Sequence, residues 1–362
     1  MNIRKSKWFC PEPFSNIFIS TDGNAAPCCV SGNWPLDKHT THNIKDWKKA
    51  QNSSFFKGLR SDLARGEGKY IDKYCTWCSD VEKSGNKSHR QHYVERLTEE
   101  ELELIEKSYK DGEDYDPPFI KSLQIKALGG NYCNLSCHMC LASESSGLAH
   151  ENRKLGIEDN HPSDRPAKYF FPWSQTGLEE YLKNTQVLKL VGGETLAIKQ
   201  NYDTLKKCIT SGIAKNIEVQ IITNATMFPV FDNFDIFDYI PHFKKMTISC
   251  SVEVWGKQND YIRYPSTWEE TQKNIYKLND TQAHVNVVST VNALNVGYLH
   301  MMDFPVHSFS SVVSKDNAFC ITSIPPDIRK ELKLLPQHVS LLESYEYDEK
   351  NMNKMLDIIR IR

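Results

Sequence analysis

The chain has 362 residues, which is enough for one large domain or two smaller ones with a buried core. Its 44 basic and 46 acidic side chains nearly balance, and this argues against a dedicated nucleic-acid or membrane-surface binder. No apolar segment is long enough to span a bilayer, and no signal-peptide core follows the basic start, so we expect a cytoplasmic protein. In a reducing compartment, the 11 cysteines are expected to be metal ligands or redox groups rather than disulfides.

The N-terminal segment, residues 1–97, is predicted to combine a β-hairpin with helices. Residues 16–20 alternate between the two faces of a strand, Asp22-Gly23-Asn24 is a turn signal, and a returning strand ends at Pro27-Cys28-Cys29. This hairpin would bring Cys10 and Cys28 to one end. Helices are expected around residues 44–51 and 55–64.

A second pair of cysteines, Cys75-x2-Cys78, follows these helices, at a spacing that lets both sulfurs bind one metal. Together with Cys10 and Cys28 they make four thiolates, which by residue type alone could form a zinc site of the ribbon kind. The adjacent Cys29 is an alternative to Cys28, or a small buried thiol.

A linker is predicted between residues 98 and 118. Thr98-Glu99-Glu100-Glu101 is a capped and acidic helix start, so a helix is expected over residues 97–109. The polar run from Asp111 to Pro118 then breaks the chain and predicts a domain boundary.

From residue 120 onward, apolar strands alternate with helical patterns, which predicts βα units around a parallel sheet. The expected strands are 120–128, 186–191, 217–223, 245–250, 284–291 and 310–313. The expected helices include 198–211, 229–239 and 267–278. In parallel barrels, functional groups collect where the strands end.

Three cysteines at a close spacing, Cys133-x3-Cys137-x2-Cys140, directly follow the first of these strands. A loop leaving a strand end can turn its thiolates toward one point. Iron–sulfur clusters normally take four thiolates, so three of them predict a cluster with one open iron. Structural zinc with a distant fourth ligand, or buried thiols acting as small hydrophobic groups, are the alternatives.

Polar motifs follow the later strands as well. After the second strand, Gly192-Gly193-Glu194 offers glycines that allow close backbone approach and a carboxylate that can accept from an ammonium group. Thr223-Asn224 follows the third strand, Ser249 lies in the fourth, and Arg263 lies downstream. Asn292 follows the fifth strand.

This set of motifs resembles the radical S-adenosylmethionine (radical SAM) superfamily, whose signature is similar to the Cys133, Cys137 and Cys140 triplet. The resemblance implies a partial (β/α)6 TIM-type barrel over residues 119–320. It also implies a 4Fe–4S cluster that cleaves S-adenosylmethionine reductively to a 5′-deoxyadenosyl radical. That radical would abstract hydrogen from an unidentified peptide or small molecule, with an electron donor such as a flavodoxin or ferredoxin.

The same resemblance implies roles at the other strand ends. Gly192, Gly193 and Glu194 would meet the methionine amine, and Arg263 would hold the carboxylate. The remaining cofactor contacts would come from Thr223, Asn224, Ser249 and Asn292. Ala225 stands where the family has glycine, and Met139 where it commonly has an aromatic residue.

The N-terminal segment resembles the auxiliary-cluster modules called twitch and SPASM. The similarity lies in the elements Gly23-x4-Cys28, Asn43-Ile44, Trp47, Leu59-Arg60, Cys75-x2-Cys78 and Glu82. It implies one auxiliary iron–sulfur cluster, 4Fe–4S by expectation, held by Cys10, Cys28, Cys75 and Cys78. Here the module precedes the barrel, whereas in most relatives it follows.

Two further segments complete the predicted organisation. An insertion over residues 142–181 contains the aromatic run 169–173, which we interpret as a packing patch or a substrate wall. Residues 321–362 are predicted to be a helical extension.

The alternative hypothesis for the whole chain is a non-catalytic zinc-ribbon scaffold on a degenerate barrel. A third hypothesis keeps the radical SAM core but places zinc at the N-terminal site.

Overall fold

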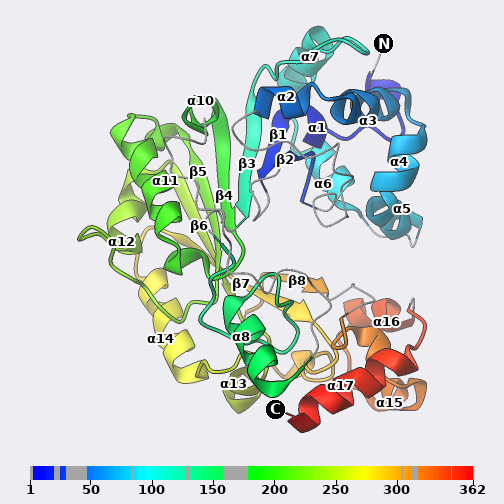
Figure 1. Ribbon diagram of the computed structural model, residues 1–362, viewed down its shortest axis with the longest axis vertical. Helices are drawn as coiled ribbons and strands as arrows, with labels where there is room; N and C mark the ends of the chain where they lie inside the picture. The colour runs from blue at the N-terminus through cyan, green and yellow to red at the C-terminus, as the bar shows by residue number, and fades with distance from the viewer. Residues whose placement is uncertain are drawn as a thin grey trace. The chain divides into compact units, whose positions relative to one another are not determined.

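The structure is a computed structural model of the chain (Figure 1). It describes residues 3–19, 25–29, 47–83, 85, 87–126, 130–157, 178–302, 305–311, 317–343 and 345–361. Two compact units make up the chain. The first comprises residues 1–129, 169–190 and 203–219, and the second comprises residues 130–168, 191–202 and 220–362.

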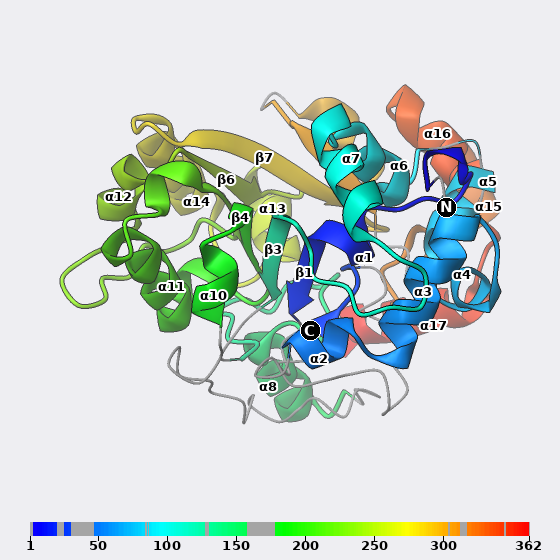
Figure 2. The same cartoon turned by 90° about the horizontal axis from the view of Figure 1, so that it is seen from above.

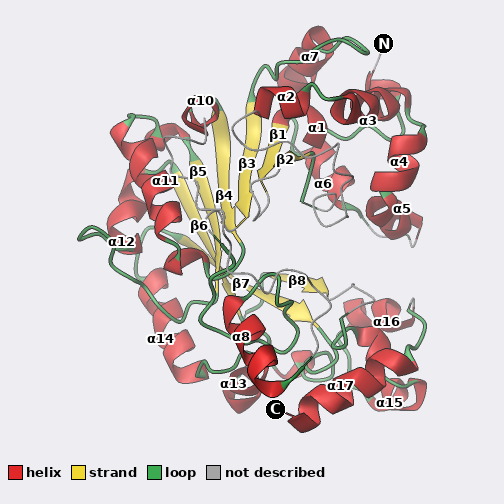
Figure 3. Ribbon diagram, viewed as in Figure 1, coloured by secondary structure: helices red, strands yellow, loops and turns green. Residues whose placement is uncertain are grey.

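An eight-stranded, mostly parallel sheet with helices defines a mixed α/β fold, as predicted (Figure 3). The strand order is β2-β1-β3-β4-β5-β6-β7-β8. The strands are β1 (Asn16–Ile19), β2 (Ala25–Ala26), β3 (Ile120–Lys126), β4 (Thr185–Val191), β5 (Glu218–Thr223), β6 (Lys245–Ser251), β7 (His284–Val291) and β8 (Ser308–Ser311). Six of them match the predicted barrel strands, with β8 starting two residues early. Closure into a partial barrel, and the predicted domain boundaries, remain predictions.

In the first unit, the predicted hairpin of β1 and β2 forms and also extends the sheet. β1 pairs antiparallel with β2, and it pairs in parallel with β3 through the register Phe18↔Gln124. The two parallel strands lie side by side in both views (Figures 1 and 2). Every residue of β1 is buried, as is typical of a strand inside a parallel sheet that is covered on both faces.

The helices of the first unit are α1 (Glu12–Ser15), α2 (Trp47–Gln51), α3 (Ser54–Arg65), α4 (Lys69–Tyr74), α5 (Thr76–Lys83), α6 (His89–Glu95), α7 (Glu99–Ser108) and α10 (Leu178–Leu182). The predicted capping box of α7 is present, because Thr98 and Glu101 each bond the other's backbone N–H. In α3, the fully buried Arg60 donates to the carbonyl oxygens of Pro13 at 3.2 Å and Gln51 at 2.5 Å. Arg60 therefore joins α3 to the segments before it.

The helices of the second unit are α8 (Ser146–Leu155), α12 (Ile236–Tyr239), α13 (Gly256–Ile262), α14 (Trp268–Asn279), α15 (Pro326–Glu331), α16 (Pro336–Glu343) and α17 (Glu349–Ile361), and α11 (Lys199–Thr210) begins there. The helix predicted over residues 229–239 was too long. Only residues 236–239 are helical, because Asp232 and Asn233 have positive φ angles and turn the chain before Asp235 caps the helix.

The core of the second unit packs the cysteine loop against the C-terminal helices. Its buried cluster joins Leu135 and Cys137 to Phe319, Ile324 and Leu342. Cys133 and Cys140 pack on the same cluster, as do side chains of α17. The C-terminal helices therefore pack against the cysteine loop. Among the described residues, no helix has both the length and the apolar character needed to cross a membrane.

Candidate functional site

The cysteine loop after β3 is held on the start of α8. The Asn131 side chain closes the loop by donating to the carbonyl oxygen of Ala142 at 3.0 Å. The N–H of Cys133 donates to the hydroxyl of Ser146 at 3.2 Å. A Cβ on Gly147 would lie 2.8 Å from the Cys133 carbonyl oxygen, so only glycine allows this close approach. These contacts fix the backbone of the loop.

The three predicted ligand thiols lie within electrostatic reach of one another. Burial raises the pKa of the Cys137 thiol to about 11, with a smaller rise from the Cys133 thiol. Burial, then Cys137 and Cys133, raise the pKa of Cys140 well above its ordinary value. Cys137 is buried, Cys133 and Cys140 are half-buried, and the three thiols oppose one another's ionisation. This donor set fits a metal cluster, because bound iron would offset the charge of the thiolates.

Gly193 packs directly on the cysteine loop. It has a φ of +58°, and a Cβ there would lie 2.4 Å from the carbonyl oxygen of Tyr132. The same carbonyl accepts a hydrogen bond from the N–H of Glu194 at 2.7 Å. The sequence predicted that these glycines let the backbone approach a ligand. At Gly193 the structure shows a close approach to the residue beside Cys133.

The Glu194 side chain is fully buried and is oriented by three donors. One carboxylate oxygen accepts from the Thr223 hydroxyl at 2.5 Å and from the Leu196 N–H at 2.9 Å. The other accepts from the Asn224 N–H at 2.7 Å. Burial raises the pKa of this carboxyl, while the three donors lower it. The predicted residues Glu194, Thr223 and Asn224 thus form one assembly.

Asn224 also connects the end of β5 to the cysteine loop. Its amide donates to the Asn134 side-chain oxygen at 2.8 Å, and Asn134 donates to the Thr226 hydroxyl at 2.9 Å. Ala225, at the family's glycine position, is buried with a φ of +57°. The backbone conformation that favours glycine is therefore kept although the residue is alanine.

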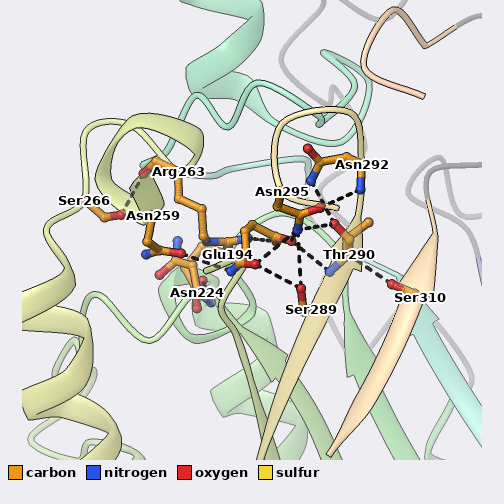
Figure 4. Close-up of polar contacts among 11 residues, drawn as sticks. Glu194, Asn224, Asn259, Arg263, Ser266, Ser289, Thr290, Asn292, Asn295 and Ser310 are labelled. Atoms are coloured by element: carbon orange, nitrogen blue, oxygen red, sulfur yellow. Dashed lines mark hydrogen bonds and ion pairs between the residues drawn. The ribbon is translucent and has the colours of Figure 1, made fainter. Parts of the chain in front are cut away.

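Arg263 forms a buried ion pair that the sequence analysis missed. Its Nη1 donates to Glu253 Oε1 at 2.9 Å, and Glu253 is fully buried just beyond β6. Figure 4 shows Arg263 in a group of polar side chains that includes Asn259, Ser266, Ser289, Thr290 and Asn295. Glu253 could have been found in the sequence as a carboxylate soon after a strand end, because functional groups collect there in parallel sheets.

The two remaining cofactor candidates differ in their surroundings. Ser249 is half-buried on β6, opposite Asn286 of β7. Asn292 is fully buried, and its amide is used within a local turn. It donates to the Thr290 carbonyl oxygen and accepts from the Leu294 N–H, at 2.8 and 2.9 Å. Their contacts to the cofactor remain predictions.

In the first unit, the N-terminal cysteines influence one another electrostatically. Burial, then Glu12, raise the pKa of Cys10 well above its usual value, with smaller rises from Cys28 and Cys75. Burial and then Cys78 raise the pKa of Cys75 to about 12. The alternative ligand Cys29 lies beside α6, with its sulfur 3.9 Å from Nδ1 of His89.

Glu82, which matched the module by sequence, connects two parts of this region. It accepts from the Arg90 guanidinium at 3.0 and 2.6 Å and from the Ser88 hydroxyl at 2.6 Å. Arg90 also donates to the carbonyl oxygen of Phe9, next to Cys10, at 3.1 Å.

The predicted elements Gly23, Asn43-Ile44 and the aromatic run 169–173 lie outside the described residues. Within the described ranges, no group of three or more His, Cys, Asp or Glu side chains is arranged to hold a metal ion.

Comparison with known proteins returned no matching family model and no matching curated protein. Solved structures do match. One is a histidine-tagged anSMEcpe with bound AdoMet, with a TM-score of 0.38 and 16% identity over 53% of this chain. Another is Streptococcus suis SuiB bound to S-adenosylmethionine, with a TM-score of 0.38 and 13% identity over 88% of this chain. SuiB bound to its precursor peptide SuiA matches 83% of this chain, with a TM-score of 0.37 and 13% identity.

Two of these three structures contain bound S-adenosylmethionine, which is written AdoMet in the description of anSMEcpe. The chain spans 50% of the length of the anSMEcpe chain, 65% of the SuiB chain with S-adenosylmethionine, and 71% of the SuiB chain with SuiA. Because the TM-scores are below 0.4, the chemistry of this chain has to be inferred from its own residues.

Proposed function

We propose that this chain is a radical SAM enzyme whose catalytic cluster is held by Cys133, Cys137 and Cys140. The observation that carries the proposal is the hydrogen bond from the Glu194 N–H to the Tyr132 carbonyl oxygen. It joins the Gly-Gly-Glu turn to the cysteine loop, although about 60 residues of sequence separate the two motifs. A ligand bound at the three thiols would therefore be next to the buried carboxylate.

A reduced 4Fe–4S cluster held by Cys133, Cys137 and Cys140 would supply the one electron needed to cleave S-adenosylmethionine to methionine and a 5′-deoxyadenosyl radical, which would abstract hydrogen from substrate. The chain's own residues bind, orient and shield the reactants. The ionised Glu194 carboxylate would accept from the methionine amine, with its orientation set by Thr223 and Asn224. Gly192 and Gly193 would keep this edge free of side chains.

Arg263 would hold the methionine carboxylate. Only its Nη1 is engaged among the described residues, so the remaining guanidinium donors can reach a ligand. Asn259 adds a buried amide nitrogen without a partner in the described part of the chain. Ser249 and Asn292 are proposed to contact the nucleoside portion. These assignments place all the cofactor-binding residues in the second unit.

For the first unit, we propose one auxiliary 4Fe–4S cluster bound by Cys10, Cys28, Cys75 and Cys78. Four thiolates leave no open iron, so this site would pass electrons or support the fold rather than cleave the cofactor. A one-electron donor such as a flavodoxin or ferredoxin would reduce the protein. The substrate is proposed to be a peptide or a small molecule.

Anaerobic reconstitution followed by iron, sulfide and zinc analysis tests this proposal. The wild-type protein should contain two clusters and release 5′-deoxyadenosine when reduced with S-adenosylmethionine. Changing Cys133, Cys137 and Cys140 together to alanine should remove one cluster and all of that product. Cys208→Ala is the matched control, because Cys208 is a buried thiol on α11 that belongs to neither set. Full iron content and product in the triple variant would refute the assignment, and zinc without iron would favour a scaffold.

A further inference from the structure

Glu253 has an unusually complete set of hydrogen bonds for a residue outside the predicted motifs. Its carboxylate accepts from Arg263 at 2.9 Å, from the Thr290 N–H at 2.8 Å and from the Asn295 amide at 3.4 Å. Its own N–H donates to the Asn259 side chain at 3.0 Å. Its carbonyl oxygen accepts from Ser289 at 3.2 Å and from Asn295 at 3.1 Å. The carboxylate is therefore held in one position by the segments that follow β6 and β7.

Arg263, the partner of Glu253, lies opposite Cys137 on the neighbouring backbone segment. The N–H of Ser136 donates to the Tyr264 carbonyl oxygen at 2.7 Å, and the N–H of His138 donates to the Ile262 carbonyl oxygen at 2.9 Å. These two bonds bracket Cys137 on one segment and Arg263 on the other. The Ser266 hydroxyl also donates to the Arg263 carbonyl oxygen at 2.7 Å (Figure 4). Arg263 is thus fixed opposite Cys137 through its backbone.

Arg263 is therefore held at two places: Glu253 binds its guanidinium, and the cysteine loop lies against its backbone. Arg263 carries a positive charge and Glu253 a negative one, so the two would act in opposite directions on a cluster bound at this loop. Because both residues are buried, water screens their charges weakly.

We propose that Glu253 is a positioning residue of the cysteine site, which holds Arg263 and sets how much positive charge acts on Cys137. This inference rests on the proposed function. Net charge near an iron–sulfur cluster is one of the determinants of its reduction potential. The Glu253–Arg263 pair thereby sets the potential of the cluster that Cys133, Cys137 and Cys140 would hold.

Redox titration of the loaded protein, monitored by electron paramagnetic resonance, tests this role with three variants. Glu253→Gln leaves Arg263 uncompensated, so the midpoint potential of the three-cysteine cluster should rise. Arg263→Gln leaves the Glu253 charge alone, so the potential should fall. The double variant carries neither charge and should lie between Arg263→Gln and the wild type. A purely structural role would not shift the two single variants in opposite directions.

Glu101→Gln is the matched control, because Glu101 is also a buried carboxylate, and it is paired with Lys121 at 2.8 Å in the first unit. It should leave the potential unchanged. If Glu253→Gln does not fold, the double variant must still show a higher potential than Arg263→Gln. Equal potentials, or shifts of the same sign in both single variants, overturn the inference alone. Wild-type protein with no cluster at the three cysteines overturns the proposed function as well.

Discussion

The backbone N–H of Glu194 donates a hydrogen bond to the carbonyl oxygen of Tyr132 at 2.7 Å, so the turn after β4 lies against the cysteine loop. This contact depends on Gly193, which has no side chain to separate the two segments. A loop that carries metal ligands and a turn that carries a buried carboxylate are thus positioned by one backbone contact.

Replacing Gly193 by alanine should destabilise the protein by about 2 kcal/mol or more and weaken S-adenosylmethionine binding. The new Cβ would meet the Tyr132 carbonyl oxygen at 2.4 Å, and the φ of +58° is unfavourable for alanine. Gly156→Ala is the control, since Gly156 also has a positive φ but has no atom within 4 Å of a Cβ. Gly156→Ala should therefore destabilise the protein by only about 1 kcal/mol, the cost of the left-handed backbone alone. Chemical denaturation and equilibrium binding measure both effects, and equal losses in the two variants would contradict the assigned contact.

Thr223→Val should lower stability by about 1–3 kcal/mol and weaken cofactor binding. The substitution keeps the shape but removes the hydroxyl, which donates to Glu194 and accepts from the Ala225 N–H at 3.0 Å. Thr223→Ser retains the hydroxyl and should keep most of the binding. Calorimetric titration of the reconstituted protein with S-adenosylmethionine would compare them. Similar affinity in the valine and serine variants would show that this hydroxyl does not orient the carboxylate.

The two adjacent thiols Cys28 and Cys29 should respond differently to replacement by serine. Cys28→Ser is expected to lose the auxiliary cluster and roughly four of its irons, because a 4Fe–4S cluster of the closed kind needs four thiolates. Cys29→Ser should keep the iron and its spectrum. Iron analysis and Mössbauer spectroscopy on both variants decide between them. The reverse pattern would make Cys29, beside His89, the ligand.

The stability of the second unit should fall as the pH drops below about 6.5, the usual pKa of histidine. Burial lowers the pKa of His338, which lies on α16 with its ring 4.9 Å from that of Phe309. A lowered pKa in the folded state means that the unfolded chain binds the proton more tightly. The contribution is therefore fully present above about 6.5 and is lost as the pH falls.

His338→Leu should remove this loss, so that its free energy of unfolding changes less between about pH 7.5 and about pH 5.5 than that of the wild type. His300→Gln, at an exposed position, is the control and should keep the wild-type dependence. Denaturant titrations at several pH values supply the measurement. An unchanged slope in His338→Leu would assign the acid sensitivity to other groups.

Much of the local structure follows from short-range patterns. The capping box of Thr98 and Glu101, the hairpin before Cys28 and the strand His284–Val291 are each encoded within a few residues. Their spacing acts directly on backbone hydrogen bonds and on the burial of one face, so they could be predicted. The spacing of Cys133, Cys137 and Cys140 can likewise be read from a short stretch of sequence, and so can the motif that contains Gly193 and Glu194.

Other relationships were decided only by the tertiary structure. The parallel pairing of β1 with β3 joins residues about 100 positions apart, and no local pattern specifies it. Nor does a pattern show that Gly193 packs on Tyr132, or that Glu253 holds Arg263 opposite Cys137. The sequence by itself determined which chemical groups this protein carries and on which strand ends they lie. Which of them touch was settled by packing, because contacts between distant segments depend on how whole elements bury their surfaces together.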